Sequence, residues 1–126
     1  MRLANTELIV AAANSDGEFR LAARLWNGSV RFNLGNNSLL MRIDEGHIES
    51  IDQLEGSKIA SADVTISAPD SDWAEMLKRV PKPFFQDLMA AVSRESFKID
   101  GDLVGFYPYY RATCRLIEIM RNINAA

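Results

Sequence analysis

The stretch Ala62-Asp63-Val64-Thr65-Ile66-Ser67-Ala68-Pro69 is followed at once by Asp70-Ser71-Asp72-Trp73. Its first seven residues alternate apolar and polar side chains, which is the pattern of a strand with one buried face. At Pro69 the period changes, and Asp70 or Ser71 is suited to cap a helix that carries Trp73, Met76 and Leu77. A strand that passes directly into a helix predicts a sheet with helices packed against it.

Three more strands are expected before this stretch. Apolar residues alternate over 30–34 and again over 39–43, and a weaker run follows at 48–51. The segments Gly35-Asn36-Asn37 and Asp44-Glu45-Gly46 separate these runs with residues that favour turns. Short turns between consecutive strands predict a largely antiparallel sheet with one covered face.

Helical spacing precedes the strands and returns after residue 69. A short helix is expected over 6–14, and the S-x-x-E pattern of Ser15 and Glu18 predicts a capping box for a second helix that ends at Asn27-Gly28. After Pro81-Lys82-Pro83, a further helix is expected to start near Phe84 and Phe85 and to carry an apolar face. A short strand around Phe97 and Ile99 and a last helix from about Pro108 complete an α+β domain that spans residues 1–126.

Composition and charge exclude several classes of function. The chain has 126 residues, 48% of them hydrophobic, and a net charge of -3, so it offers no overall basic field for nucleic acid. No segment approaches the roughly 20 apolar residues that cross a bilayer, so we expect no stable membrane insertion. Cys114 is the single cysteine and has no partner for an internal disulfide. We therefore expect a cytoplasmic protein.

Motifs of catalysis are missing from the sequence. The single histidine, His47, follows a turn and is expected to be solvated, and Cys114 is expected to pack as a small hydrophobe. No Cys/His set has metal spacing, and Gly101-Asp102-Leu103-Val104-Gly105 lacks the spacing and the lysine of a phosphate loop. We predict a protein that is not an enzyme and has no cofactor or metal. A catalytic pair of carboxylates that are distant in the sequence stays open, because a search for local motifs does not detect it.

The chain resembles the sterol carrier protein type-2-like domains from about Trp26-Asn27-Gly28 to Arg121. The resemblance rests on Trp-Asn-Gly before the first strand, on the stretch 62–73, and on Phe97-Lys98-Ile99-Asp100-Gly101-Asp102. It implies a five-stranded sheet with helices packed on one face around an apolar tunnel. It also implies that the domain carries a sterol, a fatty acid, an acyl-CoA or a quinone-like lipid.

This resemblance and the helical periodicity together predict the ligand-contacting residues. We expect the guest to lie against the sheet beneath the last two long helices, where aromatic pairs and methionines gather. The predicted contacts are Met41, Phe84, Phe85, Leu88, Met89, Val92, Phe106, Tyr109, Tyr110, Thr113, Leu116 and Met120. Polar groups that would orient the guest are Tyr107, Tyr109, Tyr110, Arg111 and Thr113.

A second interpretation stays open at this point. Adjacent aromatic residues cannot both face the same side of a helix, so one ring of each pair must face solvent, a groove or another chain. The fold would then serve as a non-enzymatic accessory or homodimerisation module whose tunnel is filled by its own side chains. Such a module would support lipid or quinone metabolism without carrying a ligand.

Overall fold

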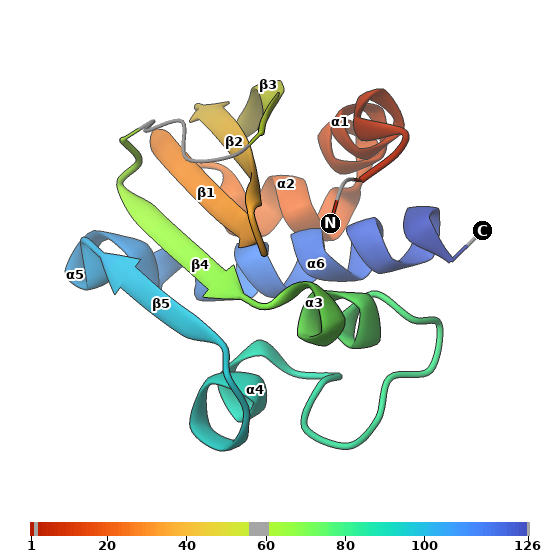
Figure 1. The fold of residues 1–126 in the computed structure, drawn as a ribbon. Helices are drawn as coiled ribbons and strands as arrows, with labels where there is room; N and C mark the ends of the chain where they lie inside the picture. Colours follow the sequence, from red (N-terminus) through yellow and green to blue (C-terminus); the bar gives the residue numbers. More distant parts are fainter. Residues whose placement is uncertain (2, 56–60, 126) are drawn as a thin grey trace.

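A five-stranded sheet in the order β3-β2-β1-β4-β5 forms one layer of the computed structural model, which describes residues 1, 3–55 and 61–125 (Figure 1). Its strands β1, β2, β3, β4 and β5 are Gly28–Leu34, Asn37–Asp44, His47–Leu54, Val64–Ala68 and Lys98–Gly101. The predicted α+β class and five-stranded sheet are confirmed.

The sheet is largely antiparallel, as predicted, with one parallel pair. The pairs β1/β2, β2/β3 and β4/β5 are antiparallel. Strand β4 lies parallel to β1, with Val30 opposite Val64 and Leu34 opposite Ala68. Because β2 already occupies one edge of β1, the returning β4 pairs with the other edge. That arrangement puts β1 at the centre of the sheet.

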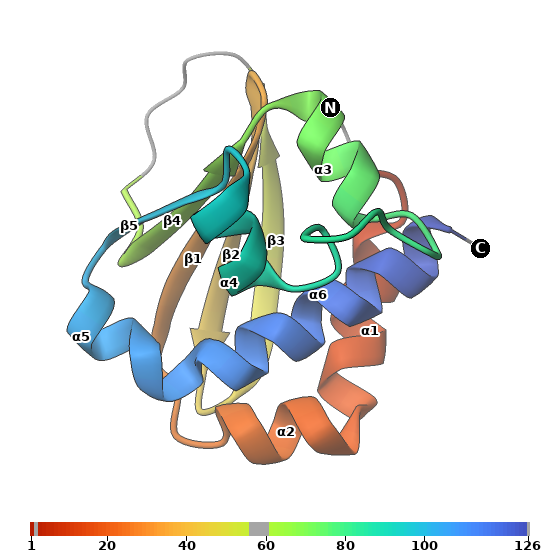
Figure 2. The same cartoon turned by 90° about the horizontal axis from the view of Figure 1, so that it is seen from below.

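The helices cover one face of the sheet. They are α1 (Thr6–Ser15), α2 (Gly17–Ala23), α3 (Asp70–Met76), α4 (Leu88–Arg94), α5 (Leu103–Phe106) and α6 (Tyr110–Asn124), with the 3-10 turn η1 (Tyr107–Tyr109) before α6. Figure 2 shows α6 crossing the strands, with α1 and α2 on one side of it and α3 and α4 on the other. Helix α6 is therefore the central element of the helical layer.

Burial follows the strand period. Val30, Phe32 and Leu34 of β1 are fully buried on the helical face. The other face carries polar side chains beside a buried Leu40: Asn33 donates from Nδ2 to Ser67 Oγ at 3.1 Å, and Arg31 donates from Nη2 to Ser38 Oγ at 3.0 Å. These side chains join β2, β1 and β4 on the open face, and the main apolar cluster lies on the helical side of the sheet.

The predicted capping box at Ser15 is wrong by one residue. Helix α1 continues through Ser15, whose hydroxyl donates to the Ala11 carbonyl at 2.7 Å. Asp16 has extended backbone angles and caps α2, because its Oδ2 accepts the Phe19 N–H at 2.8 Å. A carboxylate in the extended residue before a helix satisfies a free backbone donor, which a serine still inside α1 cannot do.

The helix predicted to begin near Phe84 and Phe85 begins only at Leu88. Phe84 has a left-handed φ of 75°, which no α-helix accommodates, and Asp87 caps α4 by accepting the Ala90 N–H at 3.3 Å. Helix α5 was not predicted from the sequence. Asp102 caps it by accepting the Gly105 N–H at 3.0 Å.

Candidate functional site

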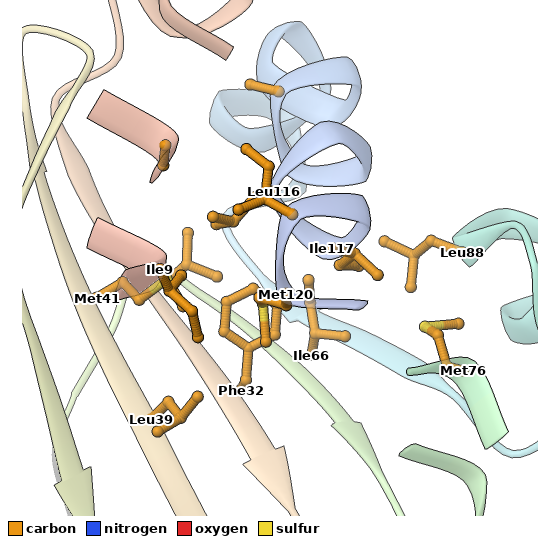
Figure 3. Packing of buried hydrophobic residues seen from close by; sticks show 14 of the residues in the cluster. Ile9, Phe32, Leu39, Met41, Ile66, Met76, Leu88, Leu116, Ile117 and Met120 are labelled. Atoms are coloured by element: carbon orange, nitrogen blue, oxygen red, sulfur yellow. The ribbon is translucent and has the colours of Figure 1, made fainter. Parts of the chain in front are cut away.

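The space between the sheet and α6 contains a continuous set of buried apolar side chains, which we call the apolar layer (Figure 3). Strands β1, β2 and β4 contribute from one side, and helices α3, α4 and α6 from the other. Its members are Phe32, Leu39, Met41, Ile66, Met76, Leu88, Leu116, Ile117 and Met120, all of them at most 4% exposed. Three of them are methionines, whose flexible thioethers fill irregular gaps in a core.

The predicted ligand-contacting residues divide between the core and the surface. Buried are Met41, Phe85, Leu88, Phe106, Thr113, Leu116 and Met120, and half-buried are Val92, Tyr109 and Tyr110. Phe84 and Met89 are 41% and 37% exposed. The structure thus brings Met41, Leu88, Leu116 and Met120 together, and contact of any of these residues with a guest stays a prediction.

A row of aromatic rings fills one side of the layer. The centroid of Phe85 lies 6.5 Å from that of Phe97, Phe97 lies 4.9 Å from Trp73, and Trp73 lies 5.7 Å from Phe32. All three contacts are edge-on, which is a favourable geometry for aromatic rings. The Trp73 indole donates to the Asn33 carbonyl at 2.7 Å. The Asp-Trp passage of the sequence therefore ties α3 to the central strand.

A small cavity of about 80 Å3 lies at the α4 end of the apolar layer. Met76, Leu88 and Ile117 of the layer line it, together with Gln86 and Asp87 before α4 and with Cys114, Glu118 and Arg121 of α6. Helix α4 closes this end, although only Leu88 and Ala91 of its seven residues are buried. Because α4 buries so little apolar surface, hydrophobic burial contributes little to holding it in this position.

Tyr110 connects this cover to α6. Its hydroxyl accepts the Met89 N–H at 3.1 Å and donates to Asp87 Oδ1 at 3.2 Å, so it reaches both residues that flank the start of α4. Burial and the neighbouring Cys114 thiol raise the pKa of Tyr110, so its hydroxyl keeps the proton that it donates. We call this pair of bonds the Tyr110 latch.

Tyr109 faces away from Tyr110, as expected for adjacent residues at the start of a helix. Its ring stacks on Trp26 with centroids 5.1 Å apart and planes at 5°, and its hydroxyl donates to the Leu25 carbonyl at 3.0 Å. Thr113 donates back to the Tyr109 carbonyl at 3.0 Å. The predicted orienting groups Tyr109 and Thr113 thus bond within the protein, and Trp26 of the Trp-Asn-Gly motif anchors α6.

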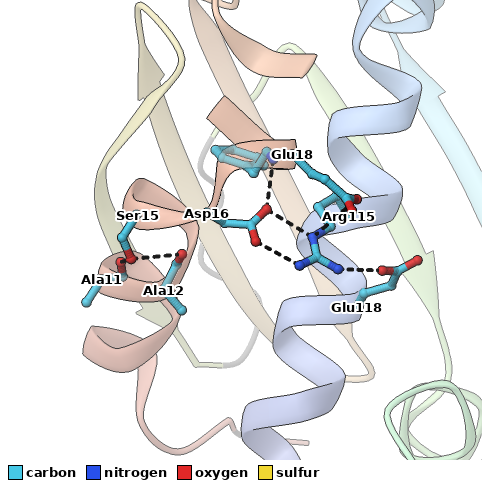
Figure 4. A network of polar contacts seen from close by, with 8 residues as sticks. Ala11, Ala12, Ser15, Asp16, Glu18, Arg115 and Glu118 are labelled. Atoms are coloured by element: carbon cyan, nitrogen blue, oxygen red, sulfur yellow. Dashed lines mark hydrogen bonds and ion pairs between the residues drawn. The ribbon is translucent and has the colours of Figure 1, made fainter. Parts of the chain in front are cut away.

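A surface groove of about 720 Å3 lies between α2 and α6. Tyr110 and Arg111, both predicted from the sequence, line it together with Leu21, Cys114 and mainly charged side chains. Arg115 also lines it, and binds Asp16 through two hydrogen bonds and Glu118 through a third (Figure 4). Arg115, Glu18 and Glu118, which line the groove, are thus ion-paired with one another or with Asp16.

Two contacts of this helical layer were not found from the sequence. Asp16 and Arg115 are 99 residues apart, and Asp87 and Tyr110 are 23 residues apart. By itself, each of these four residues looks like an ordinary helix cap or an ordinary residue on the surface of a helix. Only the arrangement of helices around α6 brings the members of each pair together.

The residues considered for catalysis, His47 and Cys114, lie on different elements, at the start of β3 and within α6. His47 is exposed, and its Nδ1 lies 3.3 Å from the Glu45 carbonyl, while burial raises the pKa of the Cys114 thiol. Within residues 1, 3–55 and 61–125, no group of three or more His, Cys, Asp or Glu side chains could hold a metal ion. No helix in the same residues is long and apolar enough to span a membrane.

The sequence from residue 9 to residue 104 matches the model of the SCP-2 sterol transfer family. The chain belongs to this family. Domains of the SCP-2 family are in general non-catalytic lipid carriers. The matched segment holds the whole sheet and α2 to α4, whereas α6 lies beyond it. No curated protein is similar to the chain at a significant level.

Solved structures show the same fold. A crystal structure of sterol carrier protein 2 is 22% identical, with a TM-score of 0.74 over 91% of this chain and 92% of its own. A Thermus thermophilus protein, described as possibly a sterol carrier protein, is 22% identical, with a TM-score of 0.72 over 100% and 92% of the two chains. A UbiJ-SCP2 ubiquinone synthesis protein is 20% identical, with a TM-score of 0.57 over 90% of each. The likeness to the Thermus thermophilus protein covers the whole chain and so includes α6.

Proposed function

We propose that this SCP-2 family protein binds and carries an apolar small molecule in the apolar layer between the sheet and α6. The guest would be a sterol, a fatty acid, an acyl-CoA or a quinone-like lipid, bound without a cofactor. The observation that carries the proposal is the methionine-containing apolar layer that ends at α4, a cover held by few apolar contacts. Family membership supports the same proposal.

The size of the guest requires α4 to move. The cavity at the α4 end measures about 80 Å3, whereas small-molecule sites usually measure roughly 300–1,000 Å3. A guest would therefore separate Leu88 from Ile117 and release the Tyr110 latch. Hiding ~300 Å2 of apolar surface would stabilise the complex by about 7 kcal/mol before association costs, enough to offset the loss of a few weak contacts.

Binding in solution tests the proposal directly. The purified protein would be examined by native mass spectrometry and then titrated with a fluorescent fatty acid, with sterols, acyl chains and quinones as competitors. We expect a bound mass or saturable binding that a competitor displaces. Absence of both would disprove the carrier function and leave the accessory module with a filled core.

A matched pair of substitutions locates the site. Ile117→Phe adds bulk at the 80 Å3 cavity, where Ile117 is 4% exposed, and we expect it to weaken fatty-acid binding about tenfold or more. Leu21→Phe adds bulk in the α2/α6 groove, where Leu21 is 66% exposed, and we expect unchanged binding. The reverse result would move the site to the groove. Thermal unfolding of both variants would verify that the fold is intact.

A further inference from the structure

Residues 78–94 form the lower edge of the molecule in Figure 1 and expose apolar side chains there. Val80 is 82% exposed, Phe84 41% and Met89 37%. Neighbouring Phe85 is only 8% exposed and contacts Phe97, so it anchors the segment to the core while Phe84 remains outside. Large apolar side chains that gather in one exposed segment indicate a contact surface.

The backbone holds Phe84 in this position. Its φ of 75° is left-handed, a conformation that is costly for a bulky residue other than glycine. Pro81 and Pro83 precede it, and the Phe85 N–H donates to the Lys82 carbonyl at 3.0 Å, which closes the turn. The guanidinium of Arg94 lies 5.3 Å from the Phe84 ring centroid. The exposed ring therefore has a defined position beside a positive charge.

Basic residues surround these apolar groups, although the whole chain carries a net charge of -3. Residues 78–98 contain five basic side chains and two acidic ones, Asp87 and Glu95. Asp87 already binds the start of α4 and the Tyr110 hydroxyl, and Lys78 binds Glu75. The exposed side chains of Arg79, Lys82 and Arg94 leave the edge with an excess of positive charge.

We propose that residues 78–94 dock the protein on the surface of an anionic lipid bilayer. Basic side chains are attracted to anionic headgroups, each contributing on the order of 1 kcal/mol, and exposed apolar residues bury themselves at the boundary with the acyl chains. The same segment closes the α4 end of the apolar layer. Docking would therefore place that end against the membrane, a consequence that rests on the proposed carrier function.

Vesicle co-sedimentation tests this surface with the full chain. Vesicles of phosphatidylcholine alone would be compared with vesicles that contain phosphatidylglycerol, at low salt and at about 0.5 M salt. We expect the protein to sediment with the anionic vesicles at low salt, and to be released at high salt because surface charges are then screened. Failure to bind anionic vesicles, or equal binding to both kinds, would disprove the proposal.

Charge reversals supply the first matched pair. Arg79→Glu with Lys82→Glu removes two basic groups from the edge, and we expect at least about a tenfold loss of vesicle binding. Arg20→Glu with Arg42→Glu makes the same change of net charge on exposed positions of α2 and β2. We expect this control to keep most of the binding. An equal loss in both double variants would show that net charge alone acts, and would overturn the proposed surface.

Exposed valines supply the second pair. Val80→Ser on the edge and Val104→Ser on α5 change residues that are 82% and 85% exposed. We expect only Val80→Ser to weaken vesicle binding, by a few fold. Equal effects of the two substitutions would contradict apolar contact with the bilayer at residues 78–94. So would self-association of the protein, seen by sedimentation velocity, that accounts for its co-sedimentation and disappears in Val80→Ser.

Fatty-acid binding in solution separates the two proposals. If the Arg79→Glu, Lys82→Glu variant binds the fatty acid normally but not the vesicles, both proposals stand. If the unmodified protein binds the fatty acid but not the vesicles, the docking surface fails alone. If it binds vesicles but no fatty acid, the carrier function fails and the docking surface stands.

Discussion

Arg115 on α6 binds Asp16 between α1 and α2 through two parallel hydrogen bonds, Nε to Oδ2 at 2.9 Å and Nη2 to Oδ1 at 2.7 Å (Figure 4). Both side chains are mostly buried, with exposed fractions of 27% and 18%. Asp16 also caps α2. One carboxylate therefore fixes the start of α2 and its position against α6.

This pair predicts loss of stability in acid. Hydrogen bonding by Arg115, and next by the Phe19 N–H, lowers the pKa of Asp16 from 3.8 to about 2. A carboxyl whose pKa is lower in the folded state stabilises the fold above its unfolded pKa and loses that contribution as the pH falls toward the folded value. We expect the free energy of unfolding to fall between about pH 5 and pH 2, with about 1–2 kcal/mol from Asp16 after solvent screening.

Substitution separates the ion pair from the cap. Asp16→Asn removes the charge but keeps a good capping residue, so its urea-unfolding free energy should be lower at pH 7 and nearly equal to that of the unmodified protein at pH 2. Asp16→Ala also removes the cap and should cost about 1 kcal/mol more at both pH values. An unchanged pH dependence in Asp16→Asn would contradict the role of the pair.

Removal of the Tyr110 latch should loosen α4 locally. Tyr110→Phe deletes the bonds to Asp87 and Met89, and we expect a global cost of about 1 kcal/mol. Hydrogen exchange should quicken mainly in the amides of Leu88–Arg94. Tyr107→Phe is the control, because Tyr107 is 56% exposed. Equal exchange in the two variants would disprove the latch.

The two tryptophans should differ in their contribution to stability. Trp73→Phe leaves a cavity at a fully buried position and removes the donor to the Asn33 carbonyl, so we expect a cost of about 2–4 kcal/mol in urea unfolding. Trp26→Phe keeps an aromatic ring to stack on Tyr109, and we expect a cost below about 2 kcal/mol. A larger cost at Trp26 would show that the Trp26 stack stabilises the fold more than the α3 anchor.

Two glycines should respond oppositely to alanine. Gly46 has a φ of 78°, and a Cβ there would lie 2.6 Å from the Ala23 carbonyl oxygen, so we expect Gly46→Ala to cost about 1–3 kcal/mol. Gly17 begins α2 with open space around it, so Gly17→Ala should be neutral or stabilise by up to about 1 kcal/mol. Thermal unfolding of both variants measures the difference, and a stable Gly46→Ala would contradict the close approach.

Local patterns were sufficient to predict the sheet. The alternation before Pro69 gave β4, and the switch of period gave α3, because both signals lie within neighbouring residues. The pattern from Phe85 to Val92 also has helical spacing, yet the left-handed Phe84 and the Asp87 cap delay α4 to Leu88. The turn at Pro81-Lys82-Pro83 and the packing of Phe85 against Phe97 together set this later start. The contact with Phe97 is tertiary, so no local pattern contains it.

The candidate site was predictable only in part. Leu116 and Met120 face the sheet as the helical period requires, and Met41 faces them from β2. The directions of the Tyr109 and Tyr110 rings depend on their contacts with Trp26 and Asp87, which are distant in the sequence. Spacing along one helix predicts that the rings of Tyr109 and Tyr110 point in different directions. The residues that each ring contacts are set by how the other elements pack against that helix.

The parallel pairing of β1 with β4 has a consequence for the order of folding. Strands β1, β2 and β3 are joined by tight turns, so each hairpin closes only a short loop. The pairing of Val30 with Val64 closes a much longer one, and contacts across long loops slow folding. We expect mutations in the β1/β2 hairpin to slow folding, and mutations in β4 and α6 mainly to speed unfolding. The side of the apolar layer built by β4 and α6 would thus assemble late, onto the earlier β1/β2 side, and come apart first.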